Sequence, residues 1–122
     1  MTQPLALVYF QSPLSGNQLV NRLQDLNYRV QAVGSTAELA SQSRTTGVML
    51  VLADVEGTGP ELIQTIRTMR ENEATCHLPI VAFAGSKTDL DSAQQAGSTM
   101  AVDTTALLMH LSVVLDQALR VD

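Results

Sequence analysis

The sequence predicts an α/β fold built on a five-stranded parallel sheet. Five short apolar runs alternate along the 122-residue chain with longer segments whose apolar residues recur at helical spacing. This alternation is typical of repeated strand–helix units, in which helices cover a parallel sheet. The runs show little in–out alternation, which indicates strands covered on both faces. The expected strands are residues 5–10, 28–33, 48–53, 80–84 and 100–102.

The first two connections are both expected to be helical. In the first, three leucines at i, i+4 and i+7 place an apolar stripe against the sheet: Leu19, Leu23 and Leu26. The second helix is expected to begin at Ser35 or Thr36, whose hydroxyl groups suit an N-cap. It carries fewer apolar residues, Leu39 and Ala40, and is the shorter element.

The third and fourth helices have clearer end signals. Thr58 and Glu61 have the spacing of a capping box, and Pro60 suits the first turn of a helix. The apolar stripe of this third helix is Leu62, Ile66 and Met69. The fourth helix is expected to begin near Ser86, with Asp89 as the reciprocal cap, and to stop at Gly97, a residue that accepts a left-handed C-cap.

The last helix is expected to run without interruption from residue 104 or 105 to about residue 120. Its core stripe consists of Leu107, Leu108, Leu111, Val114, Leu115 and Ala118. No linker or repeat interrupts the pattern, so one domain is expected over residues 1–122. Because parallel strands are joined by right-handed crossovers, the expected topology is flavodoxin-like, with strand order 2-1-3-4-5. The functional crevice of such a sheet lies at the carboxyl ends of strands 1 and 3.

Composition excludes several classes of function. The formal charge of −5 and the scattered basic residues argue against nucleic-acid binding. The apolar runs are too short for a membrane span, and residues 1–4 lack the basic region of a secretory signal, so a cytoplasmic location is expected. His77 and His110 have no metal-ligand spacing, and residues 11–16 form no glycine-rich phosphate loop. A single cysteine, Cys76, excludes an intramolecular disulfide.

Four stretches, spread over nearly the whole chain, resemble the receiver domain of bacterial two-component systems. They are similar to the family's entry into strand 2, its strand 3 with the phospho-acceptor aspartate, its strand 4, and the end of its helix 4. In this sequence they are residues 26–30, 48–54, 78–83 and 93–97. The resemblance implies a signalling domain with the topology already expected.

The resemblance also implies where phosphoryl-transfer chemistry would lie, and there the sequence departs from the family. The family uses an acceptor aspartate, an acidic pair that holds Mg²⁺, a hydroxyl residue and a lysine. Asp54 matches the acceptor. The acidic pair falls on Phe10 and Gln11, the hydroxyl position on Ala84, and the lysine position on Thr104. We therefore expect no catalytic residues and no metal site, and at most weak binding of Mg²⁺ by Asp54, with Glu56 as a further ligand.

The leading hypothesis is a non-catalytic pseudo-receiver that binds itself or a partner protein. Met109 and Val113 add apolar surface beside Leu108, on a flank of the last helix that would be exposed to solvent in a monomer. This face is expected to lie within reach of strand 5 and helix 4, and to support a homodimer. The alternative interpretation is that these residues only widen the core-facing stripe of the helix.

Two other functions stay open at the level of the sequence. The first is an atypical receiver that is phosphorylated on Asp54; against it, the Asp54 carboxylate suits a turn in which it accepts backbone N–H groups from residues 55–57. The second is a flavodoxin-like domain that binds a small ligand at the ends of strands 1 and 3.

Overall fold

The computed structural model describes residues 5–10, 13–44, 48–55, 60–73 and 75–119. Its centre is a five-stranded sheet in the order β2-β1-β3-β4-β5, parallel at every pairing. The expected flavodoxin-like topology is confirmed. The strands are β1 (Leu5–Tyr9), β2 (Arg29–Val33), β3 (Val48–Asp54), β4 (Ile80–Ala84) and β5 (Met100–Asp103).

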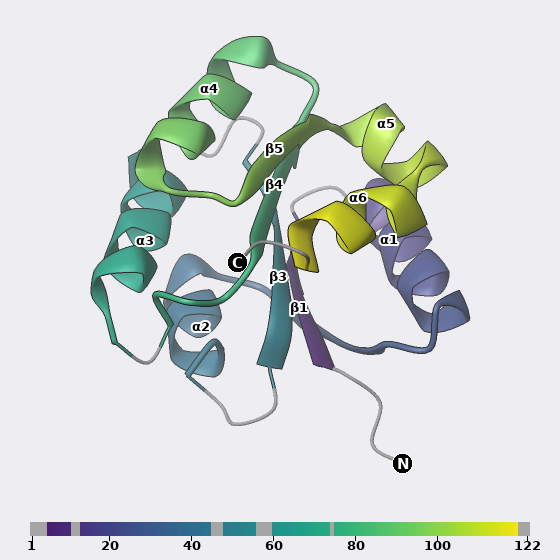
Figure 1. The fold of residues 1–122 in the computed structure, drawn as a ribbon, viewed down its shortest axis with the longest axis horizontal. Helices are drawn as coiled ribbons and strands as arrows, with labels where there is room; N and C mark the ends of the chain where they lie inside the picture. Colours follow the sequence, from purple (N-terminus) through teal and green to yellow (C-terminus); the bar gives the residue numbers. More distant parts are fainter. Residues whose placement is uncertain (1–4, 11–12, 45–47, 56–59, 74, 120–122) are drawn as a thin grey trace.

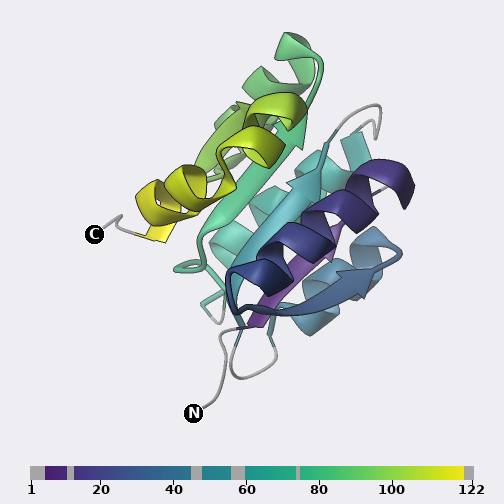
Figure 2. The same ribbon diagram turned by 90° about the vertical axis from the view of Figure 1, so that its right-hand side faces the viewer.

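Helices cover both faces of the sheet and make a three-layer fold. The helices are α1 (Pro13–Asp25), α2 (Thr36–Gln42), α3 (Pro60–Glu71), α4 (Lys87–Ala96), α5 (Thr104–Met109) and α6 (Leu111–Leu119). Figures 1 and 2 show α2, α3 and α4 on one face, and α1, α5 and α6 on the other. Two apolar clusters match these faces, one with side chains from α2, α3 and α4 and one with side chains from α1, α5 and α6. Within the described ranges, no helix is both long and apolar enough to span a membrane.

The central strand β3 shows why its sequence lacks in–out alternation. Leu50 and Leu52 are buried in the cluster under α1, α5 and α6, whereas Val51 and Ala53 are buried in the cluster under α2, α3 and α4. Successive side chains of a strand point to opposite faces, so a strand covered on both sides needs apolar residues at every position. The prediction of a doubly covered sheet is thus confirmed.

The helix ends follow most of the expected signals. Ser35 is the N-cap of α2, and its Oγ accepts a hydrogen bond of 3.1 Å from the backbone N–H of Glu38. Gly97 ends α4 in the left-handed region, with φ of 115°. Ser86 is the N-cap of α4, although its side chain makes no capping hydrogen bond with the described residues. The α3 helix begins at Pro60, and the expected Thr58 cap lies outside the described residues.

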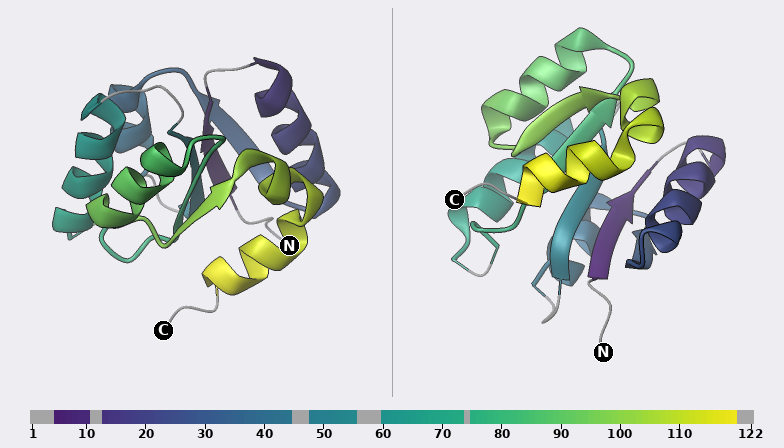
Figure 3. Two further views of the ribbon diagram at one scale, coloured as in Figure 1. Left: turned by 90° about the horizontal axis from the view of Figure 1, so that it is seen from above. Right: turned by 45° about the vertical axis from the view of Figure 1, so that its right-hand side comes forward.

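The prediction of one continuous last helix is wrong, because the chain changes direction at His110 and six helices result, not five (Figure 3). His110 has φ of −127° and ψ of 37°, outside the α-helical region. Few hydrogen bonds are lost, since the His110 N–H still donates to Ala106 O at 2.9 Å and the Val114 N–H to His110 O at 3.0 Å. The bend allows Leu107 of α5 and the apolar stripe of α6 to enter the same core cluster.

A single arginine links three segments near the amino-terminal ends of β4 and β5. Arg70, near the end of α3, donates four hydrogen bonds: Nε to Gly97 O, Nη1 to Cys76 O (2.9 Å) and Leu78 O (2.7 Å), and Nη2 to Thr99 Oγ1 (2.8 Å). Its half-buried position lowers the pKa of the guanidinium through desolvation. Arg70 therefore acts as a clamp between α3 and the connections on either side of β4.

Candidate functional site

The strand register brings the family's chemical positions to one edge of the sheet. Asp54, the last residue of β3, pairs with Phe83 of β4, and Ala84, the last residue of β4, pairs with Asp103 of β5. Tyr9 pairs with Ala53, so the residues that come next, Phe10 and Asp54, also lie side by side.

Thr104 follows β5 directly as the first residue of α5. Gln11 lies outside the described residues.

Phe10 places an aromatic ring where the family has an acidic side chain. The ring is half-buried and packs on the core cluster beneath α1 and α5. It also lies directly against Gly16 of α1, where an added Cβ would collide with the ring. Gly16 thus makes room for Phe10, a role that the sequence analysis missed. The end of β1 therefore offers Asp54 an apolar neighbour in place of a carboxylate.

The ends of β4 and β5 also lack the groups that would contact a phosphoryl group. Ala84 is fully buried among apolar side chains and has no hydroxyl. Asp103 precedes Thr104 and is the N-cap of α5, because its carboxylate accepts the backbone N–H groups of Thr105 (3.0 Å) and Ala106 (3.3 Å). The Asp103 carboxylate, which caps α5, therefore lies next to Thr104, the position where the family has a lysine.

The side chains around Asp54 do not provide the ligands that a magnesium ion needs. Mg²⁺ requires octahedral oxygen ligands and is held in proteins mainly by carboxylates. Asp54 is buried and supplies one carboxylate, whereas the ring of Phe10 and the methyl group of Ala84 supply no oxygen. The part of the chain that the structure describes contains no group of three or more His, Cys, Asp or Glu side chains placed to hold a metal. Glu56 lies outside this part.

The expected interaction face is exposed and lies beside the end of α1. Met109 is 68 % and Val113 is 55 % exposed, and Leu108 is half-buried. The break at His110 places Met109 on α5 and Val113 on α6. Met109 and Leu108 border a hollow of about 190 Å³ that is completed by the end of α1 and by Leu26, which follows the helix. The α4 helix covers the opposite face of the sheet, and α4 and α5 both pack against β5 (Figure 1).

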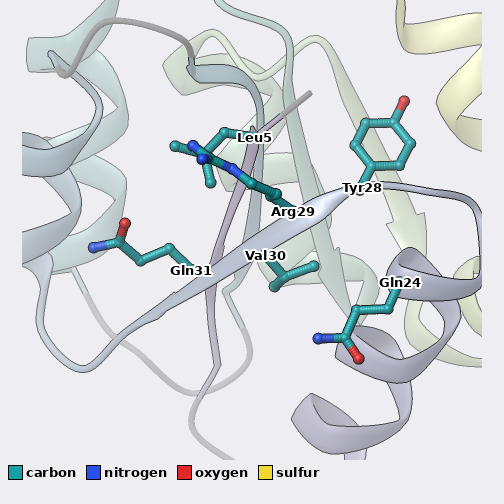
Figure 4. A pocket seen from close by; sticks show the side chains of 6 residues that line it. All are labelled: Leu5, Gln24, Tyr28, Arg29, Val30 and Gln31. Carbon is teal, nitrogen blue, oxygen red and sulfur yellow. The ribbon is translucent and has the colours of Figure 1, made fainter. Parts of the chain in front are cut away.

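A larger hollow, of about 630 Å³, lies at the other end of the sheet. It is lined by Leu5, Gln24, Tyr28, Arg29, Val30 and Gln31 (Figure 4). Leu5 and Arg29 are paired at the start of β1 and β2, at the amino edge and far along the strands from Asp54. Figure 4 shows Arg29 and Gln31 pointing to one side of β2 and Val30 to the other, so the polar groups do not converge on one point. Small-ligand sites need such convergence.

The fold is shared with receiver domains of known structure. A putative response regulator from Chloroflexus aurantiacus matches with a TM-score of 0.86 and 18% identity, over 97% of this chain and 98% of that one. The receiver domain of a sensor histidine kinase from Pseudomonas aeruginosa PAO1, with a magnesium ion coordinated in its active site cleft, matches with a TM-score of 0.85 and 18% identity, over 97% and 98%. A response regulator from Thermotoga maritima matches with a TM-score of 0.81 and 19% identity, over 98% of this chain and 100% of that one. No protein-family model and no curated protein matches the sequence.

Proposed function

We propose that residues 1–122 form a single pseudo-receiver domain, a non-catalytic signalling module that acts by protein contact without phosphorylation of Asp54. One observation carries the proposal: at the carboxyl end of the sheet beside the buried Asp54, the positions where the family has an acidic and a hydroxyl side chain are occupied by Phe10 and Ala84. The receiver fold supports the signalling role, and the substituted edge supports the loss of its phosphoryl chemistry.

Electrostatics argue in the same direction. Phosphoryl transfer depends mainly on positive charge that is already in place around the transferred group. Around Asp54 the family's lysine position is the uncharged Thr104, and the adjacent Asp103 is an acid. A phosphoryl group on Asp54 would add negative charge to an edge whose described residues offer neither a metal cage nor a cation at these positions.

Titration with Mg²⁺ tests the metal side of this proposal. Isothermal calorimetry is expected to detect no site tighter than about 1 mM, because a single carboxylate is a poor substitute for a cage of oxygen ligands. Gln11→Asp restores one carboxylate of the family's acidic pair and is expected to tighten binding. A micromolar site in the native chain that disappears in Asp54→Asn would overturn the proposal.

The protein-contact surface is proposed to be the exposed flank of α5 and α6, namely Leu108, Met109 and Val113, and the proposed partner is a second copy of the chain. Exposed apolar side chains that adjoin one another mark contact sites more often than isolated ones do. The net charge of −5 and the receiver fold support a protein partner over nucleic acid. The flank, unlike the sheet edge at Asp54, offers side chains that gain from being covered.

The alternative function, phosphorylation on Asp54, is favoured by one observation, the position of this carboxylate at the end of β3. The second alternative, a small-ligand domain, is weakened because the large hollow of Figure 4 lies at the amino edge of the sheet.

A further inference from the structure

The end of α1 forms a groove with α5 and α6. Two hollows, of about 190 and 210 Å³, share Leu26 and Ser112 and so lie side by side, and together they are called the groove. Its floor and walls are largely apolar, with Leu26 38 % exposed and Met109 68 % exposed. Arg22 and Asp25 of α1 border the same groove beside Leu26. Large apolar side chains left half-exposed next to one another indicate a surface that gains from being covered.

We propose that a second copy of this chain covers the groove through a two-fold axis, with Arg22 of each copy paired to Asp25 of the other. This inference rests on the proposed function and adds α1 to its contact surface. In a two-fold interface the same patch meets itself, so a patch of one charge sign repels its copy. On the α1 side of the groove, Arg22 and Asp25 are a cation and an anion three residues apart on one face of the helix, and this pair is self-complementary; Asp116 of α6 lines the other end.

The charges of the groove favour this occupant over an unrelated peptide. Neither the Arg22 nor the Asp25 side chain has a hydrogen-bond or ion-pair partner among the residues that the structure describes. A purely acidic or purely basic segment would pair with one of them and repel the other. A second copy supplies both opposite charges at the matching spacing, while Leu26 and Met109 of the two copies cover each other.

Charge reversal tests the proposal through a mixing experiment. Sedimentation velocity at about 100 μM is expected to show a dimer for the native chain, a concentration at which a micromolar dimer is mostly assembled. Arg22→Glu and Asp25→Arg are each expected to raise the dimer dissociation constant about tenfold or more, because each homodimer then opposes like charges twice. An equimolar mixture of the two variants is expected to dimerise again, because every pair across the mixed interface is then of opposite sign.

Matched controls lie on the opposite face of the molecule. Arg67→Glu on α3 and Asp91→Arg on α4 make the same changes in net charge at exposed positions, and both variants are expected to keep the native dissociation constant. Circular dichroism should be unchanged in all four variants, since all four side chains are exposed.

Three outcomes would overturn the inference: a native chain that is monomeric at this concentration, single reversals that leave the dimer intact, or a mixture that stays monomeric. None of them bears on Asp54 chemistry, which is measured separately. A dimer that resists the Arg22 and Asp25 reversals but dissociates in Val113→Glu would place the interface on the flank of α6 without α1.

Discussion

Arg70→Met is expected to lower the free energy of unfolding by about 2–5 kcal/mol, the largest effect of any single polar substitution considered for this chain. Methionine keeps most of the length of the side chain but removes all four hydrogen bonds of the clamp. The carbonyl groups of Leu78 and Gly97 then lose a charged donor, and bonds to charged groups are the stronger class. Arg70→Lys is expected to recover only part of the loss, because an ammonium group lacks the planar fork.

Urea unfolding followed by circular dichroism measures this effect. Arg67→Met is the matched control, since Arg67 lies one turn earlier on α3 and its exposed side chain makes no hydrogen bond with the described residues. The free energy of unfolding of Arg67→Met should stay within about 0.5 kcal/mol of that of the native chain. If the Arg70 and Arg67 variants lost equal stability, the clamp would not hold the connections around β4.

Val113→Glu is expected to convert the dimer to a monomer. The Val113 side chain is 55 % exposed in the single chain, so a charge there costs little in the monomer. In the proposed dimer the same charge would be desolvated opposite another apolar flank, and the loss of one buried valine alone removes about 1.5–3 kcal/mol. The combined free-energy penalty is large enough to dissociate a dimer whose dissociation constant is micromolar.

Light scattering after size exclusion at about 100 μM provides the measurement. Ser112→Glu adds the same charge at the neighbouring exposed position within the groove and should also dissociate the dimer. Lys87→Glu at the start of α4, on the other face, should not. A native chain that elutes as a monomer would show that α5 and α6 bind some other protein or no protein.

The sheet was predictable because β1, β3 and β4 are buried over most of their length and therefore read as apolar runs, whereas the outer strands β2 and β5 are partly exposed. The bend at His110 was not predictable, since residues 104–119 contain no proline or glycine and their apolar spacing suits one continuous helix. Packing decides the outcome there: α6 turns so that Leu111 and Leu115 join Leu107 in one cluster. The Arg70 clamp joins residues 6 to 29 positions apart, a separation that local patterns do not reveal.

The candidate site was predictable in position but not in its surroundings. Asp54, Ala84 and Thr104 could be placed at one edge because the carboxyl ends of parallel strands meet there. The contact of Phe10 with Gly16 depends on how closely α1 approaches the sheet, which periodicity does not fix. The groove is not predictable for a similar reason: the spacing of Leu26 places it in the core stripe of the first helix, whereas in the structure it is partly exposed beside Met109.

The central claim is that Asp54 no longer serves as a phospho-acceptor, and intact-mass spectrometry after incubation with Mg²⁺ and a small acyl phosphate tests it most directly. A receiver domain of known activity, treated in parallel, shows that the donor is competent. We expect the mass of this chain to stay unchanged while the control gains a phosphoryl group. A gain of one phosphoryl group by the native chain that is absent from Asp54→Asn would contradict it.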